Sequence, residues 1–205
     1  FGTLPTGNNR WHLQNLIVIF TVKMNNTMRT FTSLLCAVLW LAVSAHGQSV
    51  TWQLDTSHVQ VEGTSTIHDW TVQVPDVHGT LTMNGDQISN VELTFEVNTM
   101  VSGRGATMDD KTKKALKGDT DPQIIFKSTQ ITSKSSNQLI ASGDLTIGGV
   151  THKMDITCQS DGNGHFSAIV PLTFSQFEIE PPSALFGSIV CGEEITIHLE
   201  LQFTH

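Results

Sequence analysis

The chain has 205 residues, of which 39% are hydrophobic and 15% are charged, and its 19 acidic residues outnumber its 11 basic residues to give a net charge of −8. This acidic balance argues against binding to nucleic acid, which requires clustered basic residues. It also argues against adsorption to anionic lipid surfaces.

Residues 24–47 are predicted to be a secretory signal peptide. Arg29 supplies the positive start, Phe31 to Ala45 form an apolar run, and small residues follow that suit a cleavage site. The run is shorter than the roughly 20 residues that a spanning helix needs, so we expect cleavage rather than anchoring.

We interpret residues 1–23 as upstream or non-native sequence and expect residues 48–205 to form a single domain. We expect this domain to work in the periplasm or to be secreted, because the leader directs it out of the cytoplasm. Loss of Arg10, Lys23 and Arg29, three of the eleven basic residues, takes the net charge from −8 to −11.

Apolar and polar residues alternate along most of the chain after residue 50, which is typical of β-strands with one buried face. The clearest run is 193–203, in which Ile197 and Leu199 share a face and His198 points the other way. In chain order, the other predicted strands are 51–61, 77–83, 91–98, 124–131, 139–147, 150–158 and 165–174. Turn residues separate these runs, for example Asn84-Gly85-Asp86 and Gly148-Gly149. About eight such strands predict an all-β fold, an antiparallel sandwich or barrel.

A helix is predicted over Asp109 to Lys117, inside the long connection 100–121. Acidic residues begin it and lysines end it, which suits the helix dipole, and Gly118 can stop it. We expect this connection to cover an open end or an edge of the sheet.

Several segments in order resemble the polyisoprenoid-binding, YceI-like family of exported bacterial proteins. The most specific are "PQIIF" at Pro122 to Phe126 and "GDLTIGGVT" at Gly143 to Thr151, and the resemblance extends over 51–204. "STIHDW" and "PPSALFG" are similar to the variant found in Bacteroidetes. The resemblance implies a lipocalin-like antiparallel β-barrel with an apolar tunnel that holds a long isoprenoid, a quinone or a similar lipid. Such proteins often pair, which implies a possible homodimer. Where many members carry aromatic residues after the helix, this chain has "LKGDTD".

The residues expected to line such a tunnel are the inward apolar positions of the strands together with an anchoring tryptophan and two residues of the loop after Pro181-Pro182. They are Val59, Val61, Trp70, Leu81, Leu93, Phe95, Val97, Phe126, Leu145, Ile147, Met154, Ile156, Phe166, Val170, Leu172, Leu185, Phe186, Ile197 and Leu199. The small residues Gly79, Ala141, Gly143 and Ala168 are expected to leave space for the ligand. A long prenyl chain would bind by apolar burial, at roughly 25 cal/mol per Å².

Two alternatives to a lipid tunnel stay open. One is a metal or metalloenzyme site at the barrel mouth, built from His58, His68 and His78. The other is a filled barrel with a structural or stress role in the cell envelope. We predict no catalytic residues, since the chain lacks a nucleophile elbow and the neighbours His68 and Asp69 would face opposite sides of an extended strand.

The stretch "GTSTIHDW" is therefore interpreted as a polar bend whose Trp70 packs against the barrel while His68 forms local hydrogen bonds. Beyond the leader the chain keeps two cysteines, Cys158 and Cys191. An exported protein can join two such residues in a disulfide, but their spacing alone leaves the pairing open.

Overall fold

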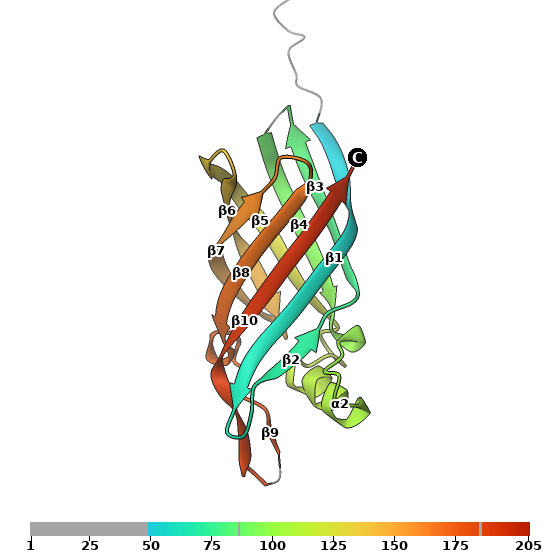
Figure 1. Ribbon diagram of the computed structural model, residues 1–205, viewed down its shortest axis with the longest axis vertical. Coiled ribbons are helices and arrows are strands. Elements are labelled where there is room, and N and C mark those ends of the chain that lie inside the picture. The colour runs from blue at the N-terminus through green and yellow to red at the C-terminus, as the bar shows by residue number, and fades with distance from the viewer. Residues whose placement is uncertain (1–48, 86, 185) are drawn as a thin grey trace, which may run out of the picture. The chain divides into compact units, whose positions relative to one another are not determined.

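A computed structural model of the chain describes residues 49–85, 87–184 and 186–205. The predicted leader, residues 1–23 and Leu185 lie outside these ranges, so the leader and its consequences for location stay predictions. The described part is a closed antiparallel β-barrel with one α-helix (Figure 1).

Eight strands form the barrel wall: β1 (Ser49–Ser65), β3 (Val77–Asn84), β4 (Gln87–Glu96), β5 (Gln123–Ser135), β6 (Gln138–Ile147), β7 (Val150–Ser160), β8 (His165–Thr173) and β10 (Ile189–Thr204). The sheet order is β2-β1-β3-β4-β5-β6-β7-β8-β10-β9, and pairing of β1 with β10 closes it. The eight predicted strands and the all-β barrel are confirmed, because alternation identifies every strand that has one face inside.

Two short strands were not predicted: β2 (Trp70–Gln73) and β9 (Ser183–Ala184). They add to the sheet by pairing with β1 and β10 respectively, and neither is long enough to show a periodic pattern. The predicted strand 91–98 ends early, because Val97 begins the 3₁₀ turn η1 (Val97–Thr99). A second 3₁₀ turn, η2 (Phe174–Phe177), follows β8.

The two ends of the barrel differ (Figure 1). At the hairpin end lie the tight β3–β4, β5–β6 and β7–β8 turns and the C-terminus. At the helix end lie the β1–β2 loop (66–69), β9 and the helix α2 (Ala106–Ala115). The predicted connection thus lies at one end of the barrel, as expected.

Helix α2 begins at Ala106 rather than Asp109 and ends at Ala115 rather than Lys117. Lys117, with φ of 56°, takes the left-handed conformation that turns the chain away, so the residue that ends the helix is not Gly118. Within the described residues, no helix has the length and apolar character needed to cross a membrane.

The barrel interior is apolar and its outer face is polar. Among the described residues, no polar or charged residue is buried, whereas Val97, Leu81 and Phe203 are among the most deeply buried side chains. On the outer face, Lys127 and Glu92 are directly opposite each other on β5 and β4, and their charged groups lie 2.7 Å apart. This division fixes the strand register, since a slip of one residue would exchange the two faces.

Trp70 is positioned by the strand that precedes it. The indole Nε1 donates to the Thr64 carbonyl at 2.8 Å, and the ring lies directly against the Cα of Gly63, its partner in the β1–β2 pairing. A β-carbon at position 63 would overlap the indole ring. Gly63 is therefore what allows Trp70 to lie against β1.

Substitution Gly63→Ala should destabilise the fold by displacing Trp70, at a cost of about 1–3 kcal/mol for an overpacked site. Thermal unfolding should show a Tm lower by several degrees. In a Trp70→Leu background the same glycine substitution should cost much less, because the clash is gone. Equal costs in the two backgrounds would show that Gly63 matters for some other reason.

Candidate functional site

Three cavities follow one another inside the barrel. The middle one has a volume of about 60 Å³ and is lined by apolar side chains only. It shares Leu93, Phe126, Ile156 and Leu199 with a cavity of about 70 Å³ toward the hairpin end. It shares Val61, Met100, Ile124, Ile147 and Ile197 with a cavity of about 150 Å³ at the helix end. The cavities are thus segments of one apolar path, and the shared side chains form the two necks between them.

The helix-end cavity is the largest of the three and the one that reaches polar, exposed residues. An apolar cavity of about 150 Å³ is enough to hold a benzene-sized group. An eight-stranded barrel is also at the size where the interior either fills with side chains or holds one slender ligand. The interior can therefore accept part of an apolar chain without rearrangement, and a longer chain only if the necks open.

Most of the predicted lining residues border these cavities. They are Val59, Val61, Trp70, Leu81, Leu93, Phe95, Phe126, Leu145, Ile147, Ile156, Phe166, Val170, Ile197 and Leu199. Strand alternation brings them together because one face of every wall strand points inward.

The other predicted lining residues lie elsewhere. Val97 and Leu172 are buried but border none of the three cavities. Met154 lies beside a shallow hollow with the polar Lys153 and Asp155. Phe186 is fully exposed, at 111%, in the turn between β9 and β10, and Leu185 is outside the described residues.

Several lining residues escaped prediction. Met100, Met108 and Leu116 reach the helix-end cavity from the connection that carries α2, which has no strand pattern to indicate an inward direction. At the hairpin end the additional apolar lining residues are Ile88, Val91, Ile131, Leu139, Leu201 and Phe203. Most of these residues continue the alternation of apolar and polar residues along their strands, so the period-2 pattern could have identified them as inward-facing.

Of the small residues expected to leave space, Ala141 and Ala168 line the hairpin-end cavity. Gly79 and Gly143 do not border any of the three cavities. A β-carbon on Gly79 would lie 2.7 Å from Leu93, and one on Gly143 would lie 2.8 Å from the Phe126 ring. The space over these glycines is filled by neighbouring core side chains and backbone carbonyls, which a sequence pattern cannot distinguish from an empty space.

The rim of the helix-end cavity is held together by Arg104 and His68. Arg104 Nη1 donates to His68 Nε2 at 2.6 Å, and Nη2 donates to the Asp69 carbonyl at 3.2 Å. Because arginine only donates, His68 Nε2 accepts, and the ring proton is on Nδ1, which donates to the same carbonyl at 3.1 Å. These bonds link the β1–β2 loop to the segment before α2.

His68 and Asp69 lie in the loop between β1 and β2, not on the extended strand that was expected to separate their side chains. The chain bends there because the Ser65 amide and hydroxyl both donate to the His68 carbonyl, at 3.0 and 2.6 Å. The polar bend, the packed Trp70 and the local bonds of His68 agree with the prediction.

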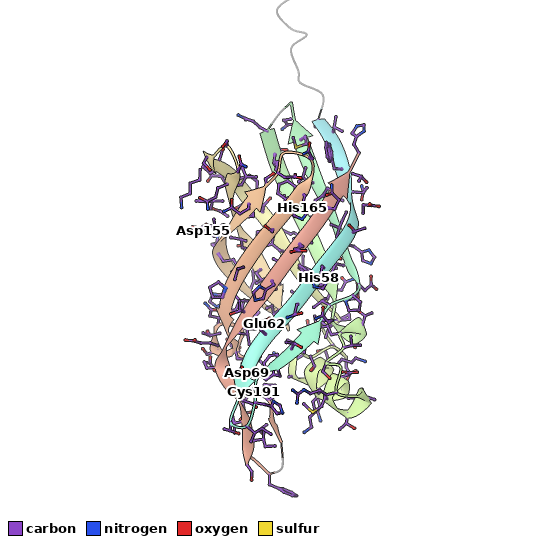
Figure 2. The ribbon with its side chains drawn as sticks, in the orientation of Figure 1. His58, Glu62, Asp69, Asp155, His165 and Cys191 are labelled. Atoms are coloured by element: carbon purple, nitrogen blue, oxygen red, sulfur yellow. The ribbon has the colours of Figure 1, made fainter. Side chains whose placement is uncertain are left out.

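The three histidines considered as metal ligands lie in different places. His58 lies on the outer face of β1, His68 contacts Arg104, and His78 lies on β3 with its Nε2 3.1 Å from Asp76 (Figure 2 labels His58 and Asp69). Within the described ranges, no group of three or more His, Cys, Asp or Glu residues is placed to hold a metal ion. The geometry therefore gives the metal alternative no support.

Cys158 and Cys191 are free thiols. Cys158 lies on β7 toward the hairpin end, whereas Cys191 lies at the helix end (Figure 2). Burial raises the pKa of both thiols, so neither is activated as a nucleophile.

Asp109 anchors the segment that carries Arg104. Its Oδ1 accepts hydrogen bonds from the Ser102 amide at 2.7 Å and the Ser102 hydroxyl at 2.6 Å. These bonds lower the pKa of the Asp109 carboxyl, with the hydroxyl bond as the largest cause. The first turn of α2 thereby ties the rim to the helix.

The fold and the cavities define a closed antiparallel barrel of the lipocalin-like class with an apolar interior. A comparison with protein families matches residues 52–203 to the YceI-like domain. The chain belongs to the YceI-like family. A comparison with curated proteins finds no match.

Solved structures share this fold at low sequence identity. BcnA of Burkholderia cenocepacia is 17% identical with a TM-score of 0.62, over 73% of this chain and 96% of that one. A YceI protein of Campylobacter jejuni is 14% identical with a TM-score of 0.55, over 65% and 84%. A polyisoprenoid-binding domain from Saccharophagus degradans, implicated in plant cell wall breakdown, is 10% identical with a TM-score of 0.56, over 74% and 97%.

Replacement Asp109→Asn should lower the Tm near neutral pH, because a neutral amide accepts the two Ser102 bonds more weakly than a carboxylate does. The folded pKa of Asp109 is below the ordinary value of 3.8, so its contribution is complete above 3.8 and is lost as the pH falls further. Thermal unfolding across pH should show the two proteins converging only below about pH 3.8. A constant difference down to the acid limit would contradict this role for the carboxylate.

Proposed function

We propose that this protein binds a long-chain isoprenoid, a quinone or a similar amphiphile in the barrel tunnel and carries it through the periplasm without catalysis. The observation that carries the proposal is the series of three apolar cavities along the barrel interior. The polyisoprenoid-binding domain with the same fold supports the ligand class, and the predicted leader supports the location.

Binding in such a tunnel depends on apolar burial. Each methylene moved from water into the apolar path contributes about 0.8 kcal/mol, so a chain of modest length binds without any hydrogen bond to its tail. The middle cavity offers no polar side chain at all. This suits a hydrocarbon tail and excludes polar substrates from the interior.

The necks determine how far a tail reaches. The neck between the middle and hairpin-end cavities includes Phe126, Leu93 and Leu199. Met100 lies at the neck toward the helix end. Methionine has three rotatable side-chain bonds and adapts to irregular space, so this neck can open by rotation. A long ligand would join the three cavities by turning these side chains.

A second candidate is a filled barrel with a structural role in the envelope. The small volume of the two inner cavities, about 60 and 70 Å³, favours it, because ligand sites for larger molecules usually have roughly 300–1,000 Å³. The lipid-binding tunnel and the filled barrel lead to different expectations about whether amphiphiles bind. They also differ in whether affinity depends on the length of the amphiphile's tail.

Ala168→Leu should shorten the tunnel, because this residue lines the hairpin-end cavity and the larger side chain would fill it. Affinity for a long prenol such as geranylgeraniol should fall roughly tenfold if two methylenes are excluded, while affinity for geraniol stays unchanged. Displacement of a fluorescent probe measures both affinities.

Thr157→Leu is the matched control, since Thr157 is exposed on the neighbouring β7 and faces outward. It should leave both prenol affinities unchanged. Failure of the unmodified protein to bind either prenol would favour the filled barrel. An equal loss for both prenols in Ala168→Leu would contradict the proposed path of the tail.

Exposed apolar side chains around the helix end support a carrier rather than a closed reservoir. The large ones at this end are Ile67, Val101, Met108, Phe186 and Val190. The β1–β2 loop and the β9–β10 hairpin that carry three of them are joined by a bond from the Thr66 amide to the Val190 carbonyl. Exposed apolar patches mark contact sites, and these side chains lie at the same end of the barrel as the opening through which a lipid would enter.

The double variant Ile67→Ser and Phe186→Ser should take up lipid from vesicles several-fold more slowly, because it removes apolar contact with the membrane. Its equilibrium affinity for a soluble prenol should not change, since neither residue borders a cavity. Stopped-flow transfer of a fluorescent lipid from phosphatidylcholine vesicles measures the rate.

Ile169 offers a matched control, because it is as exposed as Ile67, at 66% against 61%, but lies on the outer wall of β8. Ile169→Ser should leave the uptake rate as it is. If the double variant and the unmodified protein take up lipid equally fast, the helix end does not serve as the carrier's contact with membranes.

A further inference from the structure

The ladder of paired residues between β7 and β8 stops soon after the turn that joins them. The two strands pair from Ser160 opposite Phe166 to Cys158 opposite Ala168, and at no later position within the described residues. Both strands nevertheless continue toward the helix end, because β7 stays paired with β6 and β8 stays paired with β10. The barrel wall therefore contains a seam between residues 150–157 of β7 and 169–173 of β8.

Pro171 removes a donor that a longer ladder would need. The backbone groups of successive residues in a strand point alternately to its two neighbours. The His165 carbonyl accepts from the Asp161 amide on the β7 side, so the backbone of Pro171, which has the same parity, also faces β7. If the register continued, Pro171 would be opposite Asp155, where a proline has no N–H to donate. The end of the ladder thus follows from the sequence of β8.

At the helix end of the seam, side chains take the place of the ladder. The Thr173 amide, the next one on this edge of β8, donates to Gln176 Oε1 at 2.9 Å. The buried Phe177 of η2 packs edge-on against His152 of β7, with the ring centres 5.4 Å apart. Apolar packing of this kind has no fixed direction, so β7 and η2 can shift past each other without the loss of a hydrogen bond.

The seam lies beside the middle cavity. Ile156 of β7 and Val170 of β8 would be opposite each other if the register continued, and both border this cavity. Its volume is about 60 Å³, whereas ligand sites for larger molecules usually have roughly 300–1,000 Å³. To widen a wall that is joined by a ladder would leave backbone groups unpaired, which is costly. At the seam no ladder has to break.

Ladders elsewhere in the wall are also interrupted, but backbone bonds bridge those places. Where β1 leaves β3, it pairs with β2 instead, and the Val74 amide donates to the Val59 carbonyl at 2.9 Å. Where the β4–β5 ladder ends, the Val91 amide donates to the Ser128 hydroxyl at 2.7 Å. Beyond Cys158 no backbone bond joins β7 to β8 in the part of the chain that the structure describes.

We infer that the wall parts at the seam between β7 and β8 when a long tail enters, which widens the middle cavity and lets the three cavities join. This inference rests on the proposed function and names the part of the barrel that makes room for the ligand. Asp155, Thr157 and Ile169 along the seam are exposed, so water can bond to their backbone groups whether the seam is narrow or wide. A short tail that stays in the helix-end cavity does not need this movement.

Thr157→Cys together with Ile169→Cys tests the inference, because these outward-facing residues would form the next opposite pair beyond the ladder. A Cα separation of about 5.5 Å at such a position suits a disulfide. Cys36, Cys158 and Cys191 are replaced by alanine, so that only the introduced thiols react. The oxidised variant should bind geranylgeraniol roughly tenfold more weakly than the reduced variant if two methylenes are excluded. Geraniol, whose tail needs less of the tunnel, should lose much less. Displacement of a fluorescent probe measures both affinities.

Thr146→Cys together with Thr151→Cys in the same background is the matched control. These residues are opposite each other on β6 and β7, where the ladder is continuous, and their hydroxyl oxygens lie 2.8 Å apart. A disulfide at this position attaches to the same strand without crossing the seam. Oxidation of the control should therefore leave both prenol affinities unchanged.

Spin labels on the same two pairs of cysteines measure the movement itself and do not require a disulfide to form. Saturation with geranylgeraniol should lengthen the distance between the labels at positions 157 and 169. The distance between the labels at positions 146 and 151 should stay as it is. Electron paramagnetic resonance measures both distances with and without the prenol.

Two results would overturn the inference while the proposed function stands. One is equal affinity of the oxidised and reduced seam variant for geranylgeraniol, or a label distance across the seam that does not change on saturation. The other is an equal loss for geraniol and geranylgeraniol on oxidation, because the seam would then not determine how long a tail fits. Failure of the reduced variant and the unmodified protein to bind either prenol would instead contradict the proposed function itself.

Discussion

Pairing of β1 with β10 is the interaction on which the rest of the structure depends. These strands are the first and last of the barrel wall in the chain, and they pair from Gln53 opposite Thr204 to Ser65 opposite Cys191. Without this pairing the sheet would be open, with two long unpaired edges and its apolar face exposed to water. Closure turns that face inward and creates the interior in which the cavities lie.

Because β1 and β10 both extend past their neighbours, they also build the helix end. The lower half of β1 pairs with β2 instead of β3, and β10 begins in the hairpin with β9. The loops between these strands carry His68 and the exposed Ile67. One set of strand pairs therefore closes the tunnel wall and places the polar rim at its opening, so a change in the register of β1 would disturb both.

The alternating pattern predicts the barrel well because every wall strand obeys the same rule, with one face inside. It identifies inward residues such as Val59, Phe95 and Val170 for that reason. It says nothing of Met100, Arg104 or Lys111, which reach the cavity from a connection without periodicity and are placed by contacts with distant residues. The left-handed Lys117 shows the same limit, because its conformation follows from how α2 joins the barrel.

The tunnel differs in polarity along its length, and this difference has a physical consequence for selection. A uniformly apolar tunnel would accept any hydrocarbon in either direction at the same free energy per methylene. Here the middle is lined by apolar side chains only, whereas the residues around the helix-end opening include Arg104, Lys111 and His68. In the proposed function, burial of the tail contributes most of the affinity. Selection between amphiphiles then depends on contacts at the opening, because specificity is a difference between binding free energies.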